Sequence, residues 1–352
     1  MMDNLYKEYK YKIFSKLNND LIFGKFIEVD FFFVEINERK KRGSIGVDES
    51  KYLIKIINKS KELKKNLVII MSSSGLNVSD GARGLKLFAE LLKTISEARN
   101  KIVLVSLLKS FCLGGASIIA ALSRCVYFSK GLIFGLNGPK LLIDKKNLID
   151  DFYSIDKKIA NLYQTEHRHT EFKKIKILKP ENDSKDTLIE ENLILRKKMY
   201  FTKNLSKKIN FENNLILFKS KNGITSKVLL DMSLLILDNP KKNGKISFDL
   251  DCSSQALTLK QEKKNLSVCF AHLIKAVQFL KIKFRNRIIY NINKNSGGAL
   301  YVSFAAFADK VVGTKNLNIR VLPKEIEKKM IKEANESINY FEAKNIGLVN
   351  DK

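Results

Sequence analysis

The sequence predicts an α/β fold in which parallel strands alternate with helices, and the pattern occurs twice along the chain. Three observations support this prediction: short continuous apolar runs, amphipathic segments between them, and two Gly-Gly pairs that each follow an apolar run and begin a helical segment, Gly114-Gly115 and Gly297-Gly298. Strands that alternate with helices imply parallel pairing through right-handed crossovers.

The length and composition indicate two globular domains. The 352 residues exceed what one hydrophobic core usually supports, and 45% of them are hydrophobic. The four cysteines form no CxxC pair, so no metal site is expected. The N-terminal residues are too charged for a signal peptide, and no apolar run reaches the roughly 18 residues of a membrane span. The expected location is the cytoplasm, with no membrane partner.

The net charge of +27 comes from 64 Lys and Arg against 37 Asp and Glu. A basic surface can attract nucleic acid or an acidic partner. Here the basic residues are spread along the chain, and the abundance of Lys, Asn, Ile and Phe without Trp is typical of an AT-rich genome. We therefore interpret the charge mainly as compositional drift. No RNA- or DNA-recognition motif is present, so nucleic acid is not expected, whereas an acidic carrier protein remains an alternative partner.

The elements of the first half follow from apolar periodicity and breaker residues. Its strands are expected at 25–37, 66–71, 101–108, 125–129 and 132–139. Its helices are expected at 5–17, from Asp48 or Ser50 to about residue 64, at 85–98, and from the Gly114-Gly115 turn to residue 122.

The second half repeats this order after a less regular stretch. Residues 140–243 carry one clear helix near 185–200, and 203–222 shows no clear period. Strands are then expected at 245–251, 287–292 and 310–313, with an amphipathic helix at 266–284 and a Gly-Gly turn entering a helix within 294–308. Because 47 residues separate Leu67 from Gly114 and 51 separate Ile246 from Gly297, an internal duplication is the economical explanation.

The Gly-Gly turns are candidates for chemistry. A strand that ends in Gly-Gly and begins a helix lets a ligand approach the backbone closely, and the first helical N–H groups have no partner within the helix. Such donors suit an oxygen on which negative charge develops. The loop Ser72–Gly75 could supply a second donor near Gly75 or Leu76. The alternative interpretation is a tight helix-strand packing site.

At these residues the chain resembles the carboxyltransferase branch of the crotonase superfamily, in particular the biotin-independent malonate decarboxylases. The first half is similar to their β subunit in Gly43-Ser44-Ile45-Gly46, in the loop 73–77, in Gly114-Gly115, in the GLNGP turn 135–139 and in the stretch 156–165. The second half is similar to their γ subunit in Asp251–Gln255 and Ser296-Gly297-Gly298. The zinc-binding cysteines of the related acetyl-CoA carboxylase component are absent from the sequence.

The resemblance implies two tandem crotonase-like domains, each a parallel-rich sheet with ββα-type repeats packed by helices. A β-subunit-like domain would cover 1–200, a connection 201–244 and a γ-subunit-like domain 245–352. The implied catalytic residues are Gly75, Gly114, Gly115, Gly297 and Gly298. The implied substrate-binding residues are Ser74, Leu76, Gly135, Asn137, Gly138 and Ser296.

The implied activity is that of a lyase, which decarboxylates a malonyl thioester on an acyl carrier protein to an acetyl thioester and CO2. The chain itself would bind no cofactor, because a phosphopantetheine-type prosthetic group of the carrier protein is the substrate arm. Implied partners are the acyl carrier protein subunit and its transferase subunit, and a homo-oligomer is left open.

Three positions depart from the family pattern. Ser74 replaces the first loop glycine, Asn77 replaces an arginine, and Ser254 replaces a glycine in the second half. These departures favour one alternative, a scaffold subunit of the same complex without chemistry. A carboxyltransferase component of an acyl-CoA carboxylase is a second alternative.

Other reactive residues fit structural roles better. His167 and His169 form an HxH pair with no third ligand nearby in sequence, and His272 lies within an expected helix. Cys112 precedes the first Gly-Gly turn without an evident His partner and is interpreted as a core residue.

Overall fold

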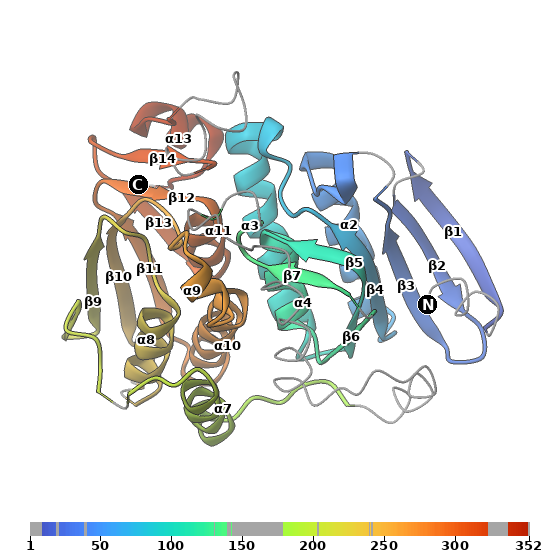
Figure 1. Ribbon diagram of the computed structural model, residues 1–352, viewed down its shortest axis with the longest axis horizontal. Coiled ribbons are helices and arrows are strands. Elements are labelled where there is room, and N and C mark those ends of the chain that lie inside the picture. The colour runs from blue at the N-terminus through green and yellow to red at the C-terminus, as the bar shows by residue number, and fades with distance from the viewer. Residues whose placement is uncertain are drawn as a thin grey trace. The chain divides into compact units, whose positions relative to one another are not determined.

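The computed structural model describes residues 9–18, 21–38, 41–129, 131–138, 142, 179–202, 204–238, 240, 242–322 and 337–350. The chain divides into two compact units, the first comprising Met1–Asn77 with Thr94–Asn182 and the second Val78–Lys93 with Asp183–Lys352. Each unit has its own main sheet (Figure 1). No helix in the described ranges is long and apolar enough to cross a membrane.

The first sheet has the strand order β1-β2-β3-β4-β5-β6, with β7 also paired to β5. The pairs from β3 onward are parallel, whereas β1, β2 and β3 are antiparallel neighbours. The strands are β1 (Tyr11–Leu17), β2 (Leu21–Phe26), β3 (Phe31–Ile36), β4 (Leu67–Ser73), β5 (Leu104–Leu113), β6 (Cys125–Phe128) and β7 (Ile133–Gly135). The helical segments between them are η1 (Lys41–Gly43), α2 (Val47–Glu62), η2 (Val78–Asp80), α3 (Gly81–Ala98) and α4 (Gly115–Leu122).

Apolar residues on both faces explain why the centre of this sheet forms. Every residue of β4 is buried, as expected of a parallel strand covered on both sides. Phe26 and Phe33 stack across β2 and β3 with ring centroids 4.6 Å apart, in a cluster that includes Val68 and Val105. The core thus packs against β4 and β5, whose carboxyl-terminal ends carry the loops of the first candidate site.

The second sheet has the order β13-β11-β10-β9-β8, parallel except for the β8-β9 pair. Strands β12 and β14 form a separate small parallel pair. The strands are β8 (Ile209–Glu212), β9 (Leu215–Ser220), β10 (Lys245–Cys252), β11 (Arg287–Ile292), β12 (Asn295–Gly297), β13 (Lys310–Gly313) and β14 (Asn318–Arg320). The helices are α7 (Lys185–Lys198), α8 (Ser226–Asp238), α9 (Leu259–Glu262), α10 (Leu266–Phe284), α11 (Gly298–Phe307) and α13 (Tyr340–Ile346).

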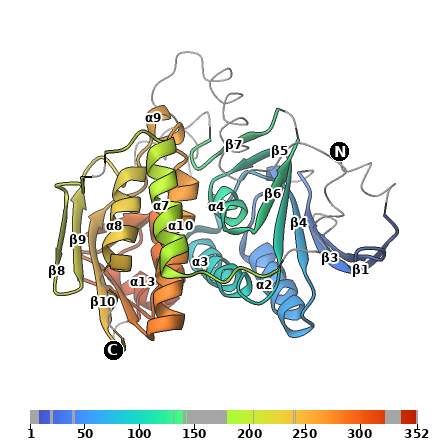
Figure 2. The same ribbon diagram turned by 90° about the horizontal axis from the view of Figure 1, so that it is seen from below.

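Helix α10 is the centre of the second unit. Every residue from Leu266 to Leu280 is buried, so this part of the helix is covered on all sides. The amphipathic helix predicted from the sequence would have been covered on one face only. Helices α7 and α8 lie beside it (Figure 2). Parallel-rich sheets packed by helices in both units confirm the predicted α/β class.

The N-terminal prediction was wrong in the described part of residues 5–17. Residues 11–17 form the edge strand β1 and not a helix. Its side chains are almost all exposed, so no buried face marks a strand in the sequence, and its lysines are typical of a protected sheet edge.

The single strand expected at 25–37 is instead the hairpin of β2 and β3. The turn between them contains Asp30 in the left-handed region, with φ of 55°. Aspartate tolerates this conformation better than most residues, so Asp30 was the available signal for the turn.

The stretch 201–244 is not a simple connection, because it contains β8, β9 and α8. Strand β9 pairs with β10 in parallel along its whole length. Its residues alternate between buried and solvent-facing positions, with only Ile216 and Phe218 buried, and this short period was hidden by the surrounding Lys and Asn.

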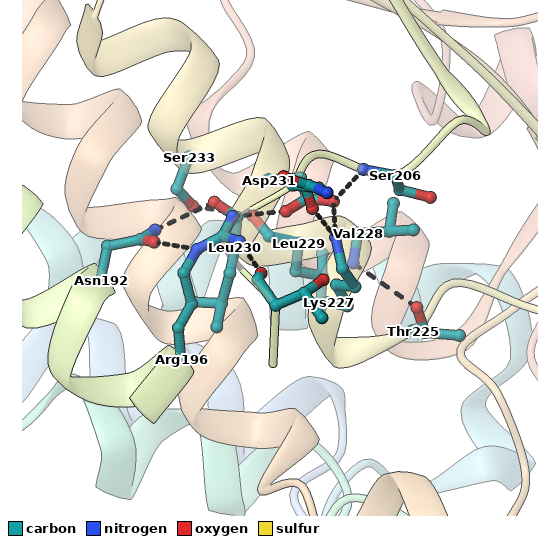
Figure 3. A network of polar contacts seen from close by, with 12 residues as sticks. Asn192, Arg196, Ser206, Thr225, Lys227, Val228, Leu229, Leu230, Asp231 and Ser233 are labelled. Atoms are coloured by element: carbon teal, nitrogen blue, oxygen red, sulfur yellow. Dashed lines mark hydrogen bonds and ion pairs between the residues drawn. The ribbon is translucent and has the colours of Figure 1, made fainter. Parts of the chain in front are cut away.

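A buried charge network joins α7 to α8 (Figure 3). The carboxylate of Asp231 is fully buried and pairs with Arg196, which is 4% exposed. Its Oδ2 also accepts from Lys227 Nζ at 2.9 Å and from the Ser206 N–H at 2.7 Å. Asn192 Oδ1 accepts from Arg196 Nε at 2.7 Å, so both ions have several polar partners.

His272 belongs to a neighbouring part of the same helix interface. Its ring is fully buried, with Nε2 3.1 Å from Asn192 Nδ2 and Nδ1 3.3 Å from Glu191 Oε2. Glu191 Oε1 lies 2.9 Å from Lys275 Nζ. Burial alone would raise the pKa of Glu191, but Lys275 and His272 outweigh it and hold the pKa well below its usual range. The position of His272 is therefore structural, as expected from the sequence.

Replacement of Asp231 should test the buried network. Asp231→Asn leaves Arg196 buried without its counter-ion, which should lower the free energy of unfolding by about 3–5 kcal/mol. The control is Asp30→Asn, which breaks the solvent-exposed pairs of Asp30 with Lys25 and Lys65 and should cost about 1 kcal/mol or less. Urea unfolding followed by circular dichroism measures both, and equal losses would contradict a special role for the network.

The pKa of Glu191 predicts a pH effect on stability. Because the pKa of Glu191 is lower in the folded chain than in the unfolded chain, the ionised carboxylate stabilises the fold at pH values above the unfolded pKa of about 4.3. This stabilisation is lost as the pH falls below about 4.3 toward the pKa of the folded state. Glu191→Gln should therefore be less stable than the wild type near neutral pH. The difference should shrink below about pH 4 in urea unfolding across a pH series, whereas a constant difference would contradict the pairing.

Candidate functional site

Two backbone hydrogen bonds join the loop before α2 to the loop after β4. The Ile45 N–H donates to Gly75 O at 2.8 Å, and the Asn77 N–H donates to Ile45 O at 3.0 Å. The Ser74 N–H also donates to Arg42 O at 3.0 Å. We call this arrangement of Ile45 with residues 75–77 the first loop bridge.

The second unit contains the same arrangement. The Ile224 N–H donates to Ser254 O at 3.0 Å, and the Ala256 N–H donates to Ile224 O at 2.9 Å, which defines the second loop bridge. Sequence reasoning missed this loop at Gly223-Ile224. The signal was a glycine followed by Ile just before a helix, as in Gly43-Ser44-Ile45-Gly46 before α2.

The two loops of the first site meet through their backbones. A Cβ on Gly75 would lie 2.6 Å from Leu113 O and 2.9 Å from Gly114 Cα, closer than side chains allow. A Cβ on Gly114 would lie 3.2 Å from Ser74 O, and the φ values of 92° and 58° at Gly75 and Gly114 also favour glycine. The structure thus brings the predicted residues Ser74, Gly75 and Gly114 together.

The free donors of this site are the N–H groups of Leu76 and Gly115. The Gly75 N–H donates to Ser73 Oγ at 3.1 Å, and the Gly114 N–H donates to Gly135 O at 3.1 Å. In the described part of the chain, the Leu76 and Gly115 N–H groups have no acceptor. Gly115 is the first residue of α4, where the helix dipole is positive.

The geometry places both donors beside the contact between the loops. A Cβ on Gly75 would lie 3.0 Å from the Gly115 N, and one on Gly114 would lie 3.9 Å from the Leu76 N. Leu76 and Gly115 are both partly exposed, so a ligand can reach them. Two convergent N–H donors at an accessible helix start form a candidate oxyanion hole, in which Gly75 and Gly114 allow the close approach.

The end of β7 and the turn after it lie against the Gly114 end of the site. Gly135 lies opposite Leu113 in the β5-β7 pair and accepts the Gly114 N–H. Asn137 is fully buried, and a Cβ on Gly138 would make ordinary contact with Leu113 at 3.7 Å. Pro139, the stretch 156–165 and the pair His167 and His169 lie outside the described residues.

The second Gly-Gly turn differs from the first. A Cβ on Gly297 would lie 2.2 Å from Arg320 O and 3.0 Å from Ser253 O, so this turn is also closely packed. A Cβ on Gly298 would lie 3.1 Å from Gln255 Oε1. Gln255 is the bridge partner of Ile224, as Leu76 is of Ile45. An amide oxygen next to the helix start repels an anion, so the second turn is the weaker candidate.

Side-chain nucleophiles and metal ligands do not gather at either turn. Cys112 is fully buried, and burial raises the pKa of its thiol, which keeps the sulfur protonated. The described residues contain no group of three or more His, Cys, Asp or Glu arranged to hold a metal ion. Asn77, which replaces an arginine of the family pattern, is 9% exposed and supplies no charge.

A comparison of two glycine variants tests the close approach of the loops. Alanine at a positive φ costs about 1–2 kcal/mol, and both Gly75 and Gly81 have positive φ. A Cβ on Gly81 meets no atom within 4 Å, whereas one on Gly75 meets Leu113 O. Gly75→Ala should therefore lower the free energy of unfolding by at least about 1 kcal/mol more than Gly81→Ala. Equal losses in urea would show that the loops are not in contact.

Part of the first half of the chain matches a known family model. Residues 23–147 match the family model of the carboxyl transferase domain, and no curated protein matches the chain. Among solved structures, the chain is similar to the Pseudomonas malonate decarboxylase MdcD-MdcE hetero-dimer, with 19% identity and a TM-score of 0.34. That match covers 37% of this chain and 60% of the malonate decarboxylase chain.

Two further solved structures are similar over most of the chain. The β subunit of P. aeruginosa geranyl-CoA carboxylase has 15% identity and a TM-score of 0.37, covering 93% of this chain and 74% of that chain. Transcarboxylase 12S has 12% identity and a TM-score of 0.34, covering 99% and 84%. The stretch that matches the carboxyl transferase domain contains the first loop bridge and the Gly114-Gly115 turn.

Proposed function

We propose that the first site binds the carbonyl oxygen of a malonyl thioester and promotes its decarboxylation. The observation that carries this proposal is the pair of N–H donors at Leu76 and Gly115, which come from two different loops and have no acceptor in the described part of the chain. The donors lie in the stretch that matches the carboxyl transferase domain, a family whose description names transfer of a carboxyl group.

The chemistry requires an electron sink at the thioester. When the bond between the carboxylate carbon and the α-carbon breaks, CO2 leaves and the electron pair moves onto the thioester, which becomes an enolate. The negative charge falls mostly on the carbonyl oxygen, where the Leu76 and Gly115 N–H groups stabilise it. The enolate then takes a proton at its α-carbon and becomes the acetyl thioester, so one proton is consumed for each CO2 released.

The substrate arm and the partners follow from this proposal. The thioester would be carried on the phosphopantetheine-type prosthetic group of an acyl carrier protein, with the carrier protein and its transferase as partner subunits. Residues 1–200 and 245–352 would correspond to the two subunits of a malonate decarboxylase. The repeated loop bridge supports their common origin, although its second copy includes Ile224 from the stretch 201–244. The cytoplasm is the proposed location, because all four cysteines are free thiols.

Two alternatives are each favoured by one observation. The Gln255 side chain beside Gly298 favours a scaffold in which the second turn no longer binds an anion. The family match favours transfer of a carboxyl group to another acceptor, as in an acyl-CoA carboxylase. A carboxyltransferase would exchange the carboxyl group with biotin, whereas the decarboxylase would release it as CO2 without biotin.

Gly115→Pro should separate an enzyme from a scaffold. Proline removes the N–H but is well tolerated at the first position of a helix, and the preceding Gly114 accommodates the proline ring. With malonyl carrier protein and the partner subunits, the rate of acetyl thioester formation should fall about 10²–10³-fold. Mass spectrometry of the carrier protein measures the rate.

The matched control is Lys185→Pro, at the first position of helix α7. It should leave the rate unchanged, because it introduces the same residue at an equivalent helix position in the other unit, on a helix that contributes no donor to the site. A folded Gly115→Pro variant with the wild-type rate would show that this N–H is not used. No turnover by the folded wild type with its partners would contradict catalysis altogether.

A further inference from the structure

The second unit has a pocket at the carboxyl-terminal edge of its sheet. Its lining includes residues 219–221, Asp251, Ser253 and 294–296, which lie at the ends of β9 and β10 and in the segment after β11. Strands β12 and β14 lie next to this edge (Figure 1). Ligands of α/β sheets bind outside the carboxyl ends of parallel strands, and the volume of about 440 Å³ lies within the range of small-molecule sites.

Cations dominate the lining of this pocket. Lys219, Lys221, Lys294 and Arg320 line it, against the single carboxylate of Asp251. That carboxylate is already engaged: its Oδ2 lies 3.7 Å from Lys219 Nζ, and its Oδ1 accepts from Asn295 Nδ2 at 2.9 Å. Lys221 and Lys294 form no ion pair among the described residues. With Lys219 paired to Asp251, Lys221 and Lys294 leave an excess of about two positive charges, which suits a multiply charged anion better than a single carboxylate.

The floor of the pocket is polar and fixed in place. Ser296 is 1% exposed and its Oγ lies 2.6 Å from the buried hydroxyl of Tyr290. Asn318 Oδ1 is buried and has no hydrogen-bond partner in the described part of the chain. A buried carbonyl oxygen without a donor carries a free-energy cost that a ligand N–H or O–H would remove.

We propose that this basic pocket binds a phosphorylated organic molecule, with phosphate oxygens facing Lys221, Lys294 and Arg320 and a hydroxyl or amide group facing Asn318. A phosphate monoester or pyrophosphate carries two or more negative charges near neutral pH, which matches the excess of cations. The proposal is independent of the decarboxylation at the first site, because it concerns other residues and binding alone.

The test is calorimetric titration of the full chain at about 0.15 M salt, where long-range attraction to the +27 charge is screened. The probes are inorganic pyrophosphate, inorganic phosphate and malonate. Pyrophosphate should bind one site per chain, more tightly than phosphate, and malonate should bind at least about tenfold more weakly than pyrophosphate. Malonate binding as tight as that of pyrophosphate would overturn the assignment to phosphate.

Charge-matched variants locate the binding. The double variant Lys221→Ala with Lys294→Ala should weaken pyrophosphate binding about tenfold, since each exposed lysine contributes up to about 1 kcal/mol. The control, Lys242→Ala with Lys245→Ala, removes the same two charges at the start of β10, on the opposite edge of the same sheet, and should change binding less than about twofold. Equal effects of the pocket and control variants would show general attraction to a basic chain and would overturn the proposal.

Discussion

The geometry of both units depends on a short backbone bridge between two loops. In each unit an isoleucine ahead of a helix donates to and accepts from the loop that follows a central strand, at Ile45 in the first unit and Ile224 in the second. These hydrogen bonds hold the strand-following loop against the Gly-Gly turn, where only glycine fits between the backbones. The direction of the Leu76 and Gly115 N–H groups is thus set by main-chain contacts, and side chains contribute little to it.

The sequence predicted most of the buried elements of this fold but missed helix α8, although most of its residues are buried. The bounds of α10, β11 and β13 were predicted to the residue, because each is rich in apolar residues and is flanked by polar or charged residues. Strand β1 was not predicted, since it lies at a sheet edge with nearly every side chain exposed. Strand β9 pairs along its full length with β10, a contact between residues about 30 positions apart that no local pattern reveals.

The sequence located the candidate site and indicated a donor near Gly75 or Leu76, but it did not decide which of the N–H groups are free. The glycine pattern indicated Gly75 and Gly114, and both lie at the contact between the loops. Which N–H groups are free depends on Ser73 Oγ and Gly135 O, and these acceptors reach the glycines only in the folded chain. The same limit applies to Gln255, whose side chain reaches Gly298 from a residue more than 40 positions away.

A site made of peptide N–H groups has an evolutionary consequence. Every residue except proline carries the donor, so substitutions at Leu76 or around Gly115 can alter the side chain and leave the chemistry intact. Selection then acts on the few glycines that permit the backbone path, while the remaining surface is free to accumulate lysine and asparagine. A chain of this kind can drift far from its relatives in composition and still keep the arrangement of atoms on which its reaction would rely.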